Sequence, residues 1–405
     1  MLLQLRALVI IFLFFSSINS FGNLIVFGDS LSDGGNFPES KFPRINMAQK
    51  NSLANNTAEF YVPISNPVDT SFGHGSNKKY WPSQNSLYLS SQSPIFPEKA
   101  ERKYRSISWP QFFLSIAKQN KLMRSDIIVP SILLNQRIIQ SNFSYNYSWA
   151  YATSDLGCTN PLYQKTAHCD MTHIDQAKTA YLKTFSQSDF QKIIVPGVNT
   201  QVKFFIHDMQ HQEVIVNQRT IYVFYIGGND LIIAGNALEK KYNPLPLLQL
   251  MMGETTYHIL DAIAALLKNI PADQRPKVVY VFDQLNPKIT PFYYKKSISK
   301  FAGLIIGSTN FWLKTLSGIR NVFSKNKIQI VPVSAWYQKA SQSDYFKNSV
   351  GKACVIDGGN FDNPTHIPKN NCAGFIFWNA VHPTSEMNAL IGALFFDQLA
   401  VKKKS

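Results

Sequence analysis

Two polar residues near opposite ends of the chain have the types needed for nucleophilic chemistry. Ser30 follows the apolar run Leu24–Phe27 in a Gly-Asp-Ser turn, and His382 precedes a Pro-Thr pair. An apolar run ending in such a turn predicts a buried strand that presents the hydroxyl at the edge of a sheet. Because a serine hydroxyl is a weak nucleophile until a base removes its proton, we expect Ser30 to attack a carbonyl carbon and His382 to act as its base.

Strands and helices alternate in the sequence between these two residues. Apolar runs predict buried strands at 24–27, 221–226, 278–282 and 328–333. Helical spacing of apolar residues predicts helices near 108–114, 200–208, 259–267 and 300–322, and a last helix from 383 onward. This alternation is typical of an α/β fold in which a mostly parallel central sheet is covered by helices on both faces.

The same pattern predicts where the site lies and how many domains the chain has. Ligands of parallel sheets bind beyond the carboxyl ends of the strands. Ser30 and Asn229 each follow a predicted strand, so they should lie at this one edge of the sheet. No internal repeat or linker is evident, and we predict one domain over residues 21–405. Residues 37–105 are rich in Ser, Asn, Pro, Lys and Tyr, and they predict a long irregular insertion after the first strand.

The first 20 residues have the layout of a secretory signal peptide. Arg6 precedes an apolar run over 7–15, and small polar residues follow as far as Ser20. We therefore expect cleavage near Ser20 and a secreted or periplasmic location. The apolar run is too short for a comfortable membrane span, and no later stretch approaches the roughly 20 apolar residues that a span needs.

The net charge of the chain indicates which kinds of binding partner to expect. The 405 residues carry a formal net charge of +15, which favours anionic surroundings such as phospholipid headgroups. Association with a membrane surface is therefore expected. No nucleic-acid-binding motif accompanies the basic residues, so nucleic acid is not expected as a partner.

The four cysteines are expected to form disulfides because the chain is expected to be exported. They are Cys158, Cys169, Cys354 and Cys372. Nearest-neighbour pairing, 158 with 169 and 354 with 372, is the preferred one of three connectivities. No CxxC or clustered His-Cys spacing is present, so no metal site is expected.

The motifs resemble those of the GDSL (SGNH) family of esterases and lipases, in the same order and over most of the chain. Residues 27–33 are similar to the family block that holds the nucleophile, 227–230 to its Gly-x-Asn-Asp block, and 381–384 to the block that holds the base. The resemblance implies a three-layer SGNH-hydrolase fold. It also implies that the oxyanion is stabilised by the Ser30 backbone amide, the Asn229 side chain and a glycine amide, with Gly73 and Gly75 as competing candidates.

The residue expected to orient His382 departs from the family pattern. The family usually has an aspartate three residues before the histidine, and here that position is Asn379. An asparagine accepts a hydrogen bond from imidazole but brings no charge to stabilise imidazolium. Three interpretations remain: a Ser-His dyad oriented by Asn379, an acid supplied by Asp357 or Asp362, or a weakened homologue.

Resemblance to bacterial secreted members of the phospholipase A, lysophospholipase and glycerophospholipid-cholesterol acyltransferase type implies a function. We expect a serine ester hydrolase that cleaves acyl esters of phospholipids or lysophospholipids and transfers the acyl group where an alcohol is bound. The mechanism needs no metal or organic cofactor. Two alternatives stay open: a carbohydrate acetyl-esterase on the same scaffold, and a secreted lipid- or host-binding protein whose chemistry is impaired at Asn379.

Overall fold

A computed structural model gives the structure of this protein. The structure describes residues 21–33, 108–126, 128–131, 143–149, 151–154, 158–160, 165–167, 195–241, 244–294, 299–354, 374–377 and 380–401. The predicted signal peptide and the whole of the predicted insertion at 37–105 lie outside the described residues. The extent of the single domain therefore stays a prediction.

The centre of the molecule is a six-stranded sheet whose neighbouring strands are all parallel. Its strands, in spatial order, are β2 (Ile128–Pro130), β3 (Ser144–Asn146), β1 (Leu24–Gly28), β7 (Ile221–Tyr225), β8 (Val278–Phe282) and β9 (Lys327–Val331). Strand β1 pairs with β3 on one side and with β7 on the other. The segment after β1 therefore leaves from the middle of the carboxyl edge, where ligands of parallel sheets bind.

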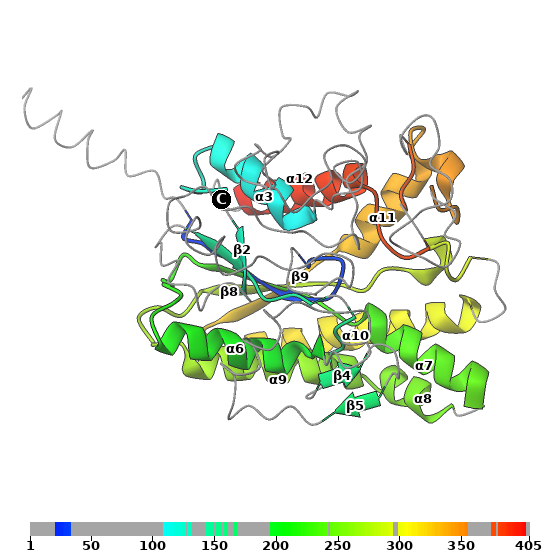
Figure 1. Cartoon of the computed structure of the whole chain (residues 1–405), viewed down its shortest axis with the longest axis horizontal. Helices are drawn as coiled ribbons and strands as arrows, with labels where there is room; N and C mark the ends of the chain where they lie inside the picture. The colour runs from blue at the N-terminus through cyan, green and yellow to red at the C-terminus, as the bar shows by residue number, and fades with distance from the viewer. Residues whose placement is uncertain are drawn as a thin grey trace, which may run out of the picture.

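Helices cover both faces of this sheet (Figure 1). One face carries α3 (Trp109–Gln119), α11 (Val333–Gln342) and α12 (Ser385–Val401), and the other carries α6 (Val198–Gln210), α9 (Glu254–Asn269) and α10 (Ser299–Phe323). Alternate side chains of β1 enter the two cores: Leu24 and Val26 pack on the α3 and α12 side, and Ile25 and Phe27 on the α6 and α9 side. A continuous apolar strand is the pattern expected of a sheet buried on both faces.

A third, smaller apolar cluster lies among α10 and three further elements. These are α7 (Gly228–Lys241), α8 (Leu245–Met251) and the segment that follows the 3-10 turn η5 (Pro287–Ile289). Leu231, Leu247, Tyr293 and Ile306 are among its buried members. The cluster adjoins the carboxyl edge of the sheet, because α7 begins three residues after β7 ends.

A small antiparallel sheet forms in the region of the first predicted cysteine pair. Strands β4 (Cys158–Asn160) and β5 (Lys165–Ala167) pair with Cys158 opposite Ala167, and β6 (Val195–Pro196) pairs with the other side of β4. Cys354 is buried and disulfide-bonded. The predicted connectivity of the four cysteines stays a prediction.

The predicted α/β fold with a mostly parallel sheet is confirmed, and each predicted strand and helix lies within a few residues of an observed one. Helices α7, α8 and α11 were not predicted. The glycines and Asn229-Asp230 that begin α7 are typical turn residues, and this local preference hides the helix start. Among the described residues, no helix combines the length and apolar character needed to cross a membrane.

Candidate active site

Ser30 lies in a tight turn directly after β1. The last residue of this strand, Gly28, pairs with Tyr225, and a side-chain carbon at Gly28 would lie 2.3 Å from the Tyr225 carbonyl oxygen. Beyond it, the Asp29 carbonyl accepts hydrogen bonds from the amides of Ser32 (3.0 Å) and Asp33 (2.9 Å). The close approach of the strands therefore requires glycine, and the turn leaves the Ser30 side chain partly exposed at the carboxyl edge.

Gln201 of α6 holds the peptide groups that precede this turn. Its Oε1 accepts a hydrogen bond from the Gly28 amide at 2.9 Å, and its Nε2 donates to the Gly28 carbonyl at 2.8 Å and to the Pro196 carbonyl at 3.1 Å. The side chain is completely buried. Sequence reasoning missed this residue, although a glutamine three positions after Val198, on the buried face of a helix, was the available signal.

Two side chains from other elements hold the far end of the turn. Asn146 of β3 donates from Nδ2 to the Ser32 carbonyl at 2.6 Å, and Trp109 of α3 donates from Nε1 to the Ser32 hydroxyl at 2.9 Å. Both residues are buried. The turn that carries Ser30 is therefore supported from both faces of the sheet.

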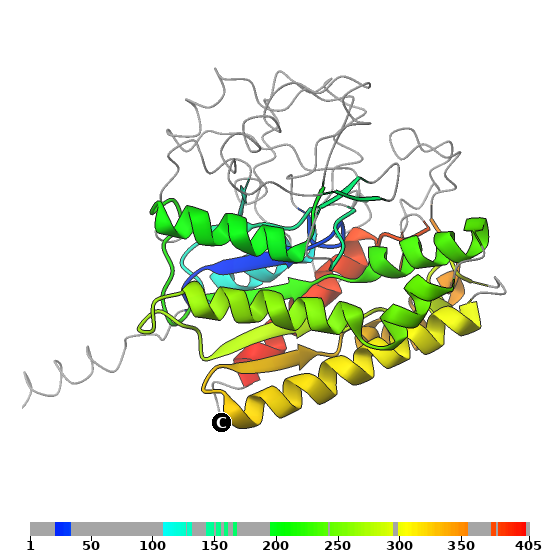
Figure 2. The same cartoon turned by 90° about the horizontal axis from the view of Figure 1, so that it is seen from below.

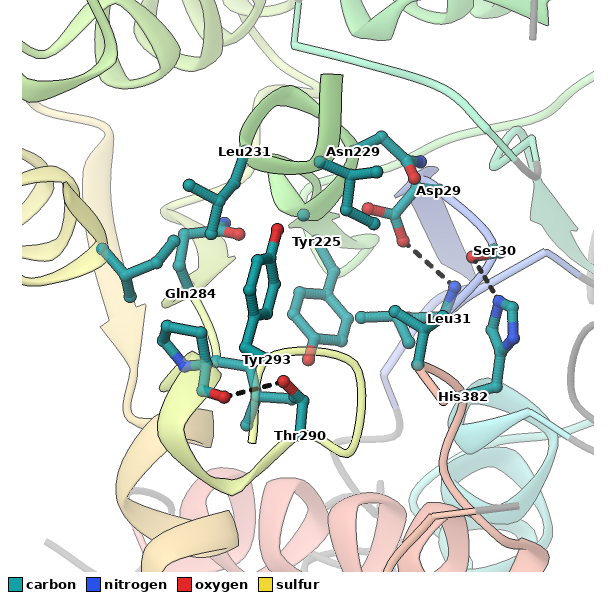
Figure 3. A pocket seen from close by; sticks show the side chains of 16 residues that line it. Asp29, Ser30, Leu31, Tyr225, Asn229, Leu231, Gln284, Thr290, Tyr293 and His382 are labelled. Carbon is teal, nitrogen blue, oxygen red and sulfur yellow. Dashed lines mark hydrogen bonds between the residues drawn. The ribbon is translucent and has the colours of Figure 1, made fainter. Parts of the chain in front are cut away.

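His382 approaches Ser30 from the segment that leads into α12. Its Nε2 lies 2.8 Å from the Ser30 Oγ, although 352 positions separate the two residues in the chain (Figure 3). Backbone contacts on either side fix the segment: the Thr384 amide donates to the Ile376 carbonyl at 2.9 Å, and the Phe292 amide donates to the Ala380 carbonyl at 2.9 Å. The structure thus brings the two predicted residues within hydrogen-bond distance.

Burial sets the protonation state of His382. The side chain is largely buried, and desolvation of the charged form lowers its pKa from 6.5 to about 4. At neutral pH the imidazole is therefore uncharged and has a nitrogen able to accept a proton. A neutral imidazole within 2.8 Å of a hydroxyl has the geometry of a general base with its nucleophile.

Asn229 lies at the start of α7, beside the same edge. Its Nδ2 donates to the Ala152 carbonyl at 2.8 Å, which fixes the amide in one orientation. Because an amide nitrogen carries two hydrogens, this bond leaves one N–H for a ligand. Asn229 lines the pocket that contains Ser30 and His382, as expected for a donor to an oxyanion (Figure 3).

The two aspartates next to these residues organise the turns. Asp29 accepts a hydrogen bond from the Leu31 amide at 3.0 Å, and Asp230 accepts from both the amide and the hydroxyl of Ser154. Burial raises the pKa of Asp29 to about 7, and the nearby Asp230 charge adds to this rise. Burial also raises the pKa of Asp230, while the bonds from Ser154 oppose the rise.

Five of the predicted site residues lie outside the described residues. They are the proposed orienting residue Asn379, the alternative acids Asp357 and Asp362, and the candidate oxyanion glycines Gly73 and Gly75. Their roles therefore stay predictions. Within the described part of the chain, no group of three or more His, Cys, Asp or Glu side chains is placed to hold a metal ion.

A mostly apolar pocket extends from the serine and histidine toward the third core cluster. Ser30, Asn229 and His382 contribute polar atoms to its wall, and so do Gln284, Thr290 and Tyr293 on the side away from the Ser30–His382 pair. The remaining wall is formed by side chains that include Leu31, Leu231, Ile232, Leu285, Ile306 and Val381. A mostly apolar pocket beside the serine and histidine can hold an apolar group next to the reacting atoms.

Replacing the glutamine beneath the nucleophile tests its role in positioning Ser30. Gln201→Leu would leave the buried Gly28 amide and carbonyl without their side-chain partners, so we expect a loss of about 2–4 kcal/mol in the free energy of unfolding and a reduced kcat. Urea unfolding and hydrolysis of a soluble p-nitrophenyl ester measure the two effects. The control Gln119→Leu, at an exposed position, should change stability by less than about 0.5 kcal/mol. Equal stability of the two variants would contradict the assignment.

The pH dependence of hydrolysis tests the protonation state of the base. Because burial lowers the His382 pKa, imidazole stays neutral and active as the pH falls below 6.5 and becomes protonated only near pH 4. We expect kcat/KM for a soluble ester to fall with a midpoint near pH 4. Circular dichroism at each pH separates this loss from unfolding. A midpoint at 6.5 or above in folded protein would instead indicate that a carboxylate stabilises the imidazolium.

Comparison with known proteins agrees with this geometry. The model of the family described as GDSL-like Lipase/Acylhydrolase matches residues 24–395, from the first strand to the last helix. The search of curated proteins returns no match. Since the family model covers most of the sequence, including Ser30, Asn229 and His382, this chain belongs to the GDSL-like lipase/acylhydrolase family.

Proposed function

We propose that this protein is a secreted serine esterase that releases fatty acids from phospholipids or lysophospholipids. Membership of the family implies ester hydrolysis. The observation that carries the narrower proposal is the 2.8 Å contact between Ser30 Oγ and His382 Nε2 in the wall of a mostly apolar pocket. The apolar body of the pocket favours a hydrocarbon chain over an acetyl group as the acyl part of the substrate.

The first half of the reaction forms an acyl-enzyme. Ser30 Oγ attacks the ester carbonyl carbon while His382 Nε2 takes the hydroxyl proton. The carbonyl oxygen becomes an oxyanion, for which we propose the Ser30 amide, the second N–H of Asn229 and a glycine amide as donors. Collapse of this intermediate breaks the ester C–O bond, and His382 returns its proton to the departing alcohol.

The second half releases the acyl group. A water molecule attacks the acyl-serine, His382 accepts its proton, and collapse frees the fatty acid and restores the Ser30 hydroxyl. Any alcohol bound in place of water would take the acyl group by the same steps. Acyl transfer is therefore an extension of the same chemistry, and its extent depends on the acceptor bound.

The charge of the protein supports a phospholipid source for the ester. A formal net charge of +15 attracts anionic headgroups, and this effect acts on association with a charged surface more than on catalysis itself. We also propose export, because residues 1–20 have the order of a basic residue, an apolar run and small polar residues.

Covalent labelling and product analysis test the proposal. We expect a fluorophosphonate to label Ser30 and the protein to release fatty acid from lysophosphatidylcholine. Ser30→Ala should abolish labelling and lower turnover by about 10⁴-fold or more. Asn229→Ala should lower kcat by about 10²–10³-fold, whereas Asn269→Ala, whose amide also bonds a main-chain carbonyl but lies exposed on α9, should leave it unchanged.

A series of p-nitrophenyl esters separates the proposed function from its rivals. Activity that rises from acetate toward longer acyl chains would support the lipid substrate. A maximum at acetate would favour the carbohydrate acetyl-esterase. Absence of both labelling and release, in protein that is folded by circular dichroism, would favour a binding role.

Changing Asn379 tests what orients the histidine. If Asn379 is the orienting residue, Asn379→Asp would add a charge that stabilises imidazolium, and we expect kcat to rise by about tenfold or more and the acid limb of the pH profile to move upward. Asp357→Asn and Asp362→Asn serve as matched controls and should leave kcat unchanged. A loss of activity in either control would instead assign the acid to that position.

A further inference from the structure

The solvent-facing side of α10 carries exposed apolar residues near both ends of the helix. This 25-residue helix buries one face, which includes Ala302, Ile305 and Leu313. Its other face exposes Phe301, Leu304, Phe311, Ile319, Val322 and Phe323, with Leu304 at 63% and Phe311 at 59% of full exposure. Surface helices normally carry charged or polar residues on the face away from the core. A helix that is apolar on both faces therefore indicates a second apolar environment.

The neighbouring helix α8 extends this surface. Met251 at its end accepts hydrogen bonds from Ser308 (2.6 Å) and Trp312 (3.2 Å) of α10, so the two helices lie side by side (Figure 2). The exposed residues of this part of the chain include Leu245, Leu248 and Met252, spaced to lie on one face of α8. Isolated exposed apolar side chains are ordinary, whereas several on adjacent helices mark an interaction site. We call the set Leu245, Leu248, Met252, Phe301, Leu304 and Phe311 the α8–α10 face.

Basic residues border this surface. The segment 284–343, which contains α10, has no aspartate or glutamate. Its basic residues on α10 or against it include Lys288, Lys314 and Arg320. Lys288 of η5 lies against α10, because a side-chain carbon built at Gly303 would be 3.2 Å from its Cε, and Lys314 is exposed on α10 itself. Exposed apolar residues flanked by lysines match a surface with an apolar interior and anionic headgroups.

We propose that the α8–α10 face docks this protein on an anionic phospholipid bilayer. A second copy of the chain is a poorer occupant, because it would bring two basic surfaces together at a net charge of +15 each. This inference rests on the proposed function in one respect: docking on a bilayer would give a lipid esterase access to its substrate. The same helix connects the two, since α10 presents Leu304 to solvent and contributes Ile306, two residues later, to the wall of the catalytic pocket.

Binding to vesicles that cannot be hydrolysed tests the surface separately from catalysis. Vesicles of ether-linked phosphatidylcholine and phosphatidylglycerol have no ester bonds, so wild-type protein can be used. We expect co-sedimentation with these vesicles, weaker binding when phosphatidylglycerol is omitted, and weaker binding at raised salt. Leu304→Ser combined with Phe311→Ser removes apolar area without changing charge and should weaken binding by about tenfold or more.

A matched control uses another exposed aliphatic residue. Ile215, which is 43% exposed, follows α6 and precedes β7 at the opposite edge of the sheet from Ser30. Ile215→Ser should leave vesicle binding unchanged. All variants should keep the wild-type unfolding midpoint and the wild-type kcat on a soluble p-nitrophenyl ester, because none of these side chains lines the pocket.

The outcomes separate docking from catalysis. Equal vesicle binding by wild type and the Leu304/Phe311 double variant would overturn the docking surface. So would absence of wild-type binding in protein that still hydrolyses soluble lysophospholipid, and the proposed function would then stand. Vesicle binding that is lost in the double variant, in protein that hydrolyses no ester, would support docking and overturn the proposed function. A wild-type dimer dissociated by the double substitution, with unchanged vesicle binding, would show a contact between copies and overturn docking.

Discussion

The hydrogen bond between His382 Nε2 and Ser30 Oγ is the contact on which the proposed chemistry depends. It joins residues 352 positions apart, so it forms only if the first strand and the segment before the last helix meet at the same edge. The parallel sheet makes this meeting possible, because its strands all end on that side. Much of the polar network near the edge serves the same purpose: Gln201, Asn146 and Trp109 hold the turn that contains the serine.

Burial has opposite consequences for the histidine and for the acids near the serine. Removal from water disfavours the charged form of each group, so the pKa of His382 falls to about 4 and the pKa of Asp29 rises to about 7. The first shift keeps the base unprotonated at neutral pH. The second reduces negative charge beside the position where an oxyanion would form. Burial therefore keeps the base able to accept a proton and also limits the negative charge around the reacting atoms.

Helix α10 links the interior of the molecule to its surface. Its buried side helps to build the third core cluster and supplies Ile306 to the pocket, while its outer side exposes apolar residues next to basic ones. The stability of the fold explains why the inner side of α10 is apolar, but not why the outer side is. The outer side adds nothing to the core, and a lipid surface is the environment that would make use of both its apolar residues and its lysines.

The sequence by itself determined the alternation of strands and helices, and it identified Ser30, Asn229 and His382, because buried strands and short polar turns are local patterns. It did not reveal the start of α7, where turn-forming residues begin a helix packed against the sheet. It also gave no indication of which polar side chain would hold Gly28, since Gln201 lies 173 positions away in the chain and meets that peptide group only in the folded protein. The distance between Ser30 and His382, the lowered pKa of the imidazole and the apolar face of α8 and α10 were decided by tertiary structure alone. Each depends on which segments exclude water from one another, and no local pattern contains that information.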